Sequence, residues 1–119
     1  MKGRKAAVKA IAGALKRVPK PPSDLTPLAQ QVWRTELPPL VRAEKIAAHE
    51  LPMFKSYCSA TARVDEAQAE IDKHGLLIVS GSGELKRNPA TTIQKEAIAL
   101  QARLATEFGI TPASRNKNE

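Results

Sequence analysis

The sequence predicts a mostly α-helical protein, in which two long antiparallel helices are joined by a short β-hairpin and a kinked helix packs on them. Two observations lead to this class. Apolar residues recur at helical spacing, and the 42% of hydrophobic residues include nineteen alanines, whereas aromatic residues make up only 3%. Because Ala buries little surface, the core is thin. A thin core favours packed helices and indicates that partner chains complete the burial.

The positive charge of the chain is concentrated at its N-terminus. The 119 residues are expected to divide into a basic flexible arm with a Pro-rich linker (1–22), a helical oligomerisation core (23–115) and a polar tail (116–119). The arm carries the whole net charge of +7, since the rest of the chain has 12 basic and 12 acidic residues. Such a segment suits a polyanionic partner: nucleic acid, an anionic membrane surface or an acidic protein.

Residues 1–18 have the pattern of a basic amphipathic helix. On a helical wheel the lysines lie opposite Val8, Ile11, Leu15 and Val18. An isolated helix of this length is marginal in water, so we expect it to be disordered until it binds a partner. Residues 19–22, Pro-Lys-Pro-Pro, form a stiff, extended linker. No stretch of the chain approaches the ~20 apolar residues of a membrane span.

The core begins with a helix that Thr26 caps and that runs to about Ala43. Pro38 and Pro39 are expected to kink or break this helix near Leu37. A second, longer helix is predicted over residues 50–74. Its apolar positions recur at gaps of three and seven residues.

Gly75 ends the second helix, and a strand-like apolar run follows over residues 76–79. Residues 81–83 form a turn, and residues 84–86 can return as a short strand. Asn88 then caps a third helix, which Gly109 ends. The residues expected to hold the helical hairpin together are Phe54, Tyr57, Val64, Ile71, Ile93, Leu100 and Leu104.

A second stripe on the third helix consists of Ile98, Ala102 and Ala105. These small side chains suit close packing against a neighbouring subunit, and we predict that they form the subunit contact. Ala is also simply a good helix former, which is an alternative explanation of the stripe.

Residues with catalytic or metal-binding potential are few. His49 and His74 have no second ligand at i+3 or i+4, and residues 81–83 lack the Gly-Lys-Ser/Thr of a phosphate loop. Four acids at 65–72 could hold a cation, but Arg63 and Lys73 flank them, which is typical of a solvated charged face. Cys58 is expected to be a buried small hydrophobe. We therefore predict no catalytic residue, no metal and no cofactor. The alternative is a small metal-dependent nuclease that uses Asp65, Glu66, Glu70 and Asp72.

The basic arm is the strongest candidate for binding. It has no aromatic residue on which bases could stack, which argues against a platform for single-stranded nucleic acid. Arg4 and Arg17 have the chemistry to contact guanine. The arm residues predicted to contact phosphates are Lys2, Arg4, Lys5, Lys9, Lys16, Arg17 and Lys20.

The C-terminal part of the chain carries a specific motif. Residues 108–115, Phe-Gly-Ile-Thr-Pro-Ala-Ser-Arg, resemble the closing G-(L/I)-T-P-A-S-R motif of small terminase subunits of tailed bacteriophages. Upstream, Trp33, Pro38 and Leu40 are similar to the W-x4-P-x-L of that family. The similarity continues at matching spacing through Glu50, Tyr57, Cys58, Ala62, Arg63, Gly75, Gly83, Leu85 and Pro89, and it covers about residues 25–115.

This resemblance implies a function. Small terminase subunits form homo-oligomeric rings in the host bacterial cytoplasm and recognise double-stranded viral DNA for packaging. They then pass it to the large terminase subunit, which carries the ATPase and the nuclease. Only 22 residues precede the core here, too few for the helix-turn-helix domain of many members. DNA contact is therefore expected from the arm, from Lys86 and Arg87, or from the lining of the ring.

Two other functions remain open. The chain could be a non-catalytic protein-interaction adaptor whose basic arm docks an acidic partner. More distantly, the arm could lie on a membrane surface.

Overall fold

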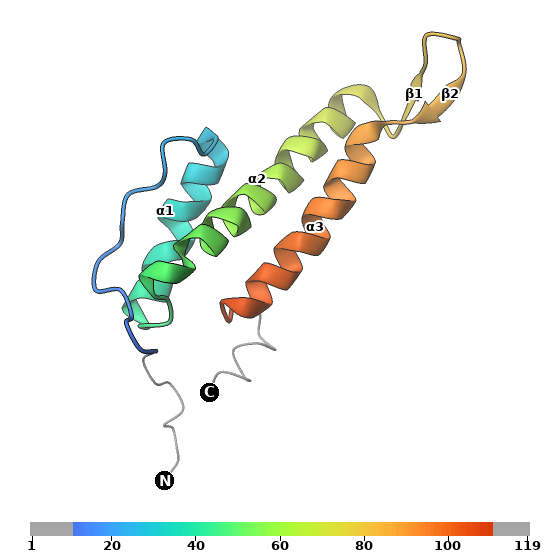
Figure 1. Cartoon of the computed structure of the whole chain (residues 1–119). Coiled ribbons are helices and arrows are strands. Elements are labelled where there is room, and N and C mark those ends of the chain that lie inside the picture. Colours follow the sequence, from blue (N-terminus) through green and yellow to red (C-terminus); the bar gives the residue numbers. More distant parts are fainter. Residues whose placement is uncertain (1–10, 111–119) are drawn as a thin grey trace.

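A computed structural model describes residues 11–110 and contains three α-helices, a 3-10 turn and a two-stranded sheet. α2 and α3 run antiparallel side by side, and the β-hairpin projects beyond their shared end (Figure 1). α1 packs against the other end of α2. The elements are α1 (Pro27–Arg42), η2 (Ala48–Glu50), α2 (Leu51–His74), β1 (Leu77–Val79), β2 (Leu85–Arg87) and α3 (Pro89–Glu107). The predicted mostly helical architecture is confirmed.

α1 begins as the sequence predicts and is continuous at the position where a kink or a break was expected. Thr26 Oγ1 accepts a hydrogen bond of 3.3 Å from the backbone N–H of Ala29. The helix then runs unbroken through Pro38 and Pro39 to Arg42. Leu37 and Leu40, on either side of the two prolines, are buried in the core. The burial of these two leucines offsets the loss of the two backbone hydrogen bonds that the prolines cannot donate.

α1 and α3 end with the same backbone motif. At the end of α3, Gly109 has a φ of 68° and the N–H of Ile110 bonds to the carbonyl of Ala105 at 2.9 Å. At the end of α1, Glu44 takes the left-handed position with a φ of 56°, and a 2.9 Å bond joins Lys45 N–H to the carbonyl of Leu40. This is the Schellman arrangement, which satisfies helix carbonyls that have no partner within the helix. Gly109 was predicted to end the last helix and does so.

The two ends of α2 are defined by different devices. Before its start, the turn η2 leads directly into α2 and is capped by a 2.9 Å bond from the backbone N–H of Ala47 to a carboxylate oxygen of Glu50. At its end, Gly75 has a φ of 89° and a ψ of 169°, a conformation that is almost restricted to glycine. The predicted helix over 50–74 and its termination at Gly75 are therefore confirmed.

The β-hairpin pairs Leu77 with Arg87 and Val79 with Leu85 in an antiparallel ladder. Its return strand lies one residue later than predicted. Asn88, which is buried, joins the hairpin to both helices. Its Oδ1 accepts a 3.0 Å bond from the N–H of Ala90, and its Nδ2 donates a 2.9 Å bond to the carbonyl of Gly75.

The main core lies at the α1 end of the molecule. Four aromatic rings form its centre: the ring centroids of Phe54 lie 5.4 Å from Trp33, 5.7 Å from Tyr57 and 5.5 Å from Phe108. Toward the hairpin only a small second cluster remains, made of Ala67, Ile71 and Ala90. The core is therefore thin over the half of α2 and α3 that α1 does not cover.

The residues predicted to hold the helical hairpin are mostly placed as expected. Phe54, Tyr57, Ile71 and Leu104 are buried, and Val64 and Leu100 are half-buried. Ile93 is an exception, because 45% of its surface is exposed. It lies on the part of α3 that no third element covers, so a residue predicted to be in the core is at the surface instead.

Candidate nucleic-acid interface

Residues 11–22, which we call the N-terminal strap, are extended along the body and are not helical. Ala14 forms an isolated antiparallel bridge with Ala47. The N–H of Leu15 donates to the carbonyl of Ile46 at 2.8 Å. We expected this segment to be disordered in the free chain and helical only with a partner. In its described part it is instead held in an extended form, because the segment after α1 offers hydrogen-bond partners to its backbone. The remainder of that predicted helix lies outside the described residues.

A tryptophan of α1 anchors the C-terminal part of the strap. The indole Nε1 of Trp33 donates a hydrogen bond of 2.8 Å to the carbonyl of Pro19. Leu15, nearer the start of the strap, packs against the main core. The strap therefore contacts the body at both ends, which fixes the backbone from which its basic side chains extend.

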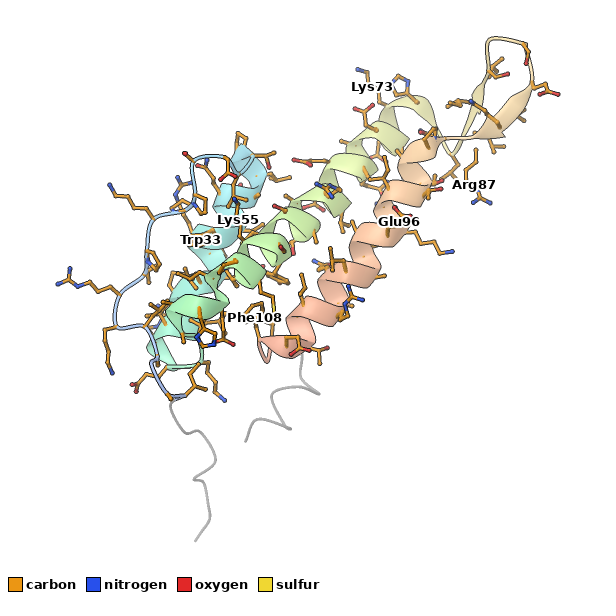
Figure 2. The ribbon with its side chains drawn as sticks, in the orientation of Figure 1. Trp33, Lys55, Lys73, Arg87, Glu96 and Phe108 are labelled. Atoms are coloured by element: carbon orange, nitrogen blue, oxygen red, sulfur yellow. The ribbon has the colours of Figure 1, made fainter. Side chains whose placement is uncertain are left out.

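Three predicted DNA-contacting residues lie on the strap: Lys16, Arg17 and Lys20, all exposed. Figure 2 shows basic side chains that extend from the strap into solvent. The Nζ of Lys16 lies 3.2 Å from a carboxylate oxygen of Glu44. Both side chains are well exposed, so the ion pair is weak and a phosphate can replace Glu44 as the partner of Lys16. The other predicted arm residues, Lys2, Arg4, Lys5 and Lys9, lie outside the described part of the chain.

The hairpin cations are at the opposite end of the molecule from the strap (Figure 1). Lys86 and Arg87 are exposed neighbours on β2, so their side chains point to opposite faces of the ribbon. The intervening α2 has 24 residues, or about 36 Å of helix. The structure does not bring the two cationic groups together within one chain.

One further cation at the hairpin end was missed by the sequence analysis. Lys73, in the last turn of α2, lies near the base of the hairpin, as does Arg87 (Figure 2). Its position was visible in the sequence, but it was treated only as a neighbour of the acidic cluster.

The stripe predicted as the subunit contact divides between surface and core. Ile98 is 48% exposed and Ala102 is exposed as well. Ala105 is only 6% exposed and belongs to the main core cluster of its own chain. Ala105 lies near the end of α3 that joins the main core, so its own chain already covers it. On the surface the stripe is limited to Ile98 and Ala102.

The acidic cluster of α2 is spread along an exposed helix. Glu70 lies 3.7 Å from His74, and Asp72 accepts a hydrogen bond of 2.9 Å from Gln68. Within residues 11–110, no three His, Cys, Asp or Glu side chains converge on a point where a metal ion could bind. Asp65 and Glu66 are also exposed. The described residues thus offer no geometric support for the nuclease alternative.

Cys58 is fully buried in the main core. Burial, with a smaller contribution from the negative charge of Glu36, raises the pKa of its thiol to about 12. The thiol is therefore protonated at neutral pH, which does not suit a nucleophile.

A thin helical core, exposed apolar side chains and exposed cations at both ends define a small helical protein whose surfaces suit macromolecular partners. None of the helices over residues 11–110 is long and apolar enough to cross a membrane. Residues 29–119 match the family model described as "Phage terminase, small subunit", and the chain belongs to this family. No curated protein and no solved structure matches the chain. The family resemblance seen in the sequence is confirmed, and the strap lies outside the matched region.

Proposed function

We propose that the protein is a ring-forming, DNA-binding adaptor for packaging of a phage genome. In this role it binds double-stranded viral DNA in the host cytoplasm and recruits or regulates the large terminase subunit, without catalysing a reaction itself. The observation that supports DNA contact most directly is the fixed strap with three exposed cations, in a chain of the terminase small-subunit family.

The proposed contact is with the phosphate backbone. Lysine and arginine side chains on an extended strap can each neutralise one phosphate, and each contact releases a counterion from the DNA. Such contacts position the protein but carry no direct sequence information. Three contacts are weak in one chain, but a ring would repeat them around the DNA and raise the overall affinity through effective concentration.

The proposed ring is supported by apolar surface that one chain leaves uncovered. Large hydrophobic side chains are exposed on the hairpin and on the part of α3 beyond α1: Leu76, Leu77, Val79, Leu85, Ile93 and Ile98. A monomer rarely exposes so many neighbouring apolar side chains, and burial between subunits removes them from water. Light scattering on the purified protein tests this part. A folded monomer at high micromolar concentration would exclude the ring.

DNA contact is tested by gel shift with random duplex at increasing salt. A triple variant with Lys16→Gln, Arg17→Gln and Lys20→Gln is expected to bind more weakly. The slope of log affinity against log salt should fall by up to about 2.7 if all three contact phosphate. A control variant with Arg34→Gln, Lys95→Gln and Arg103→Gln removes the same charge from exposed helical positions. Equal loss in the two variants would argue against the strap as the site.

The alternative adaptor function makes a different prediction in the same assay. A chain whose cations dock an acidic protein has no need to bind random duplex at low salt. Absence of any shift at low salt would therefore favour the protein-interaction adaptor over the DNA-binding one.

A further inference from the structure

A shallow groove lies between α2 and α3 near the middle of the helical pair. It has a volume of about 450 Å³ and is lined by Ala60 and Arg63 of α2 and by Ile93, Glu96, Ala97 and Leu100 of α3. Its lining residues on α3 run from Ile93 to Leu100, which is about 10 Å of helix at 1.5 Å per residue. Four of its lining residues are apolar, and Arg63 and Glu96 contribute one charge of each sign.

The β-hairpin offers an apolar surface of matching length. Val79 and Leu85 are directly paired across the ladder, so their side chains share one face of the ribbon with Leu77. The exposed fractions of Val79 and Leu85 are 69% and 65%. Each strand has three residues and is about 10 Å long. A two-stranded ribbon with a bare apolar face is only marginally stable in water and gains from being covered.

The hairpin cannot reach the groove of its own chain. It points away from the helices along their axis (Figure 1). Its base is fixed by a bond of 2.8 Å from the N–H of Asn88 to the carbonyl of Leu76 and by the Asn88 side chain on Gly75. A hairpin seated in the groove must therefore come from another copy of the chain.

One charge on the hairpin face has an opposite partner in the groove, which also holds Arg63 on its α2 side. Arg87 is the residue of β2 that shares the apolar face with Leu85, because the two are separated by one position. Glu96 lines the groove between Ile93 and Leu100 and is exposed. When the apolar face covers the groove, the Arg87 guanidinium can pair with the Glu96 carboxylate. Lys86, on the opposite face of the ribbon, then points to solvent.

We infer that the hairpin of one copy docks in the α2–α3 groove of the next. This contact joins two different surfaces, so it repeats head to tail and closes a ring when the rotation between copies allows it. The inference rests on the proposed oligomeric function and identifies the surfaces that would mediate it. It also explains why Ile93, which was predicted to be buried, is exposed in a single chain.

A charge-reversal series on the full chain tests this contact, with oligomeric mass measured by light scattering. Arg87→Glu alone should lower the oligomer fraction at a fixed concentration by about tenfold or more, and Glu96→Arg alone should do the same. The double variant should recover most of the loss. Lys86→Glu is the matched control, because it makes the same charge change on the other face of the ribbon. An equal loss from Lys86→Glu, or no recovery in the double variant, would overturn the inference.

Cysteine pairing gives an independent readout of the same geometry. Leu85→Cys and Ile93→Cys variants, oxidised after mixing, should form covalent dimers, while either variant alone should not. The native Cys58 is fully buried and does not interfere. Dimers from Leu85→Cys alone would indicate hairpin-to-hairpin contact and overturn the proposal, as would the absence of any mixed dimer.

The failure of this inference can be told from the failure of the proposed function. An oligomeric protein that binds duplex but shows neither the charge rescue nor the mixed dimer would refute the docking while leaving the proposed function in place. A chain that stays monomeric would refute both.

Discussion

The phenolic hydroxyl of Tyr57 on α2 donates a hydrogen bond to a carboxylate oxygen of Glu36 on α1, with 2.6 Å between the two oxygens. Tyr57 is buried and its ring contacts Phe54, whereas Glu36 is only half-buried. This bond therefore joins the two helices at the border between the aromatic core and solvent. Burial, followed by the hydrogen bond to Glu36, raises the pKa of Tyr57 well above its ordinary value.

Removing the Tyr57 hydroxyl is expected to destabilise the protein. Tyr57→Phe keeps the ring but deletes a hydrogen bond to a charged group, and we expect a loss of about 1–2 kcal/mol in the free energy of unfolding. Glu36→Gln keeps an acceptor and should cost less. Urea denaturation of both single variants and the double variant measures the coupling. A coupling energy of zero would show that the bond contributes nothing.

Stability is expected to fall at alkaline pH because of Cys58 and Tyr57. In the unfolded chain these groups lose their protons near pH 9 and pH 10. In the folded protein their pKa values are higher, so above pH 9 the unfolded chain loses these protons more readily than the folded protein does. The free energy of unfolding is therefore unaffected by the two groups below pH 9 and falls as the pH rises toward 12. Each group costs up to about 1.4 kcal/mol per pH unit in that window.

The variant Cys58→Ala separates the contribution of the thiol. It should be slightly less stable than the wild type at pH 7, because it leaves a small cavity. Between pH 8 and pH 10 it should lose less stability than the wild type, since only the tyrosine remains to titrate at this site. Urea midpoints at several pH values measure this, and parallel pH profiles for the two proteins would contradict it.

A side chain at Gly75 is expected to strain the link between α2 and the hairpin. Gly75→Ala should cost about 1–3 kcal/mol, because a φ of 89° with a ψ of 169° is a region that other residues rarely adopt. A β-carbon there would lie 3.5 Å from the carbonyl oxygen of Leu77, an ordinary contact, so the cost arises from the backbone. Gly81→Ala is the control, since a β-carbon at that position meets no atom within 4 Å. Thermal unfolding should show a clear loss for the first variant and almost none for the second.

Loss of the indole N–H of Trp33 is expected to loosen the strap. Trp33→Phe keeps an aromatic ring in the core but removes the hydrogen bond to Pro19. Trypsin should then cleave after Lys16 and Arg17 several times faster than in the wild type, because cleavage requires the strap to leave the body. Cleavage after Lys95 on α3 serves as an internal reference. Equal acceleration at both places would indicate general unfolding instead of local release.

Several features of the fold follow from local sequence and were predicted correctly. Thr26, Gly75, Asn88 and Gly109 each set a helix end through a short-range bond or a special backbone angle, and such effects depend on few neighbours. The family could also be predicted, because its motifs are ordered along the chain and can be seen without a structure.

The candidate interface was less predictable. The pattern of residues 11–18 is amphipathic, and only the presence of the 44–47 backbone next to it shows that the strap is extended. No periodicity within the arm contains this information. The sequence could locate the charge but not the conformation that carries it.

The sequence by itself determined the helix ends at Thr26, Gly75, Asn88 and Gly109, the turn at the tip of the hairpin and the concentration of positive charge at the N-terminus. Each of these depends on residues close together in the chain. Only the tertiary structure decided which apolar side chains reach the surface. Ile93 and Ala105 lie on neighbouring stripes of one helix, yet the first is exposed and the second is buried. The difference arises because α1 packs at one end of the α2–α3 pair and leaves the other end open. The spacing of apolar residues within α3 does not indicate where a helix from another part of the chain will pack.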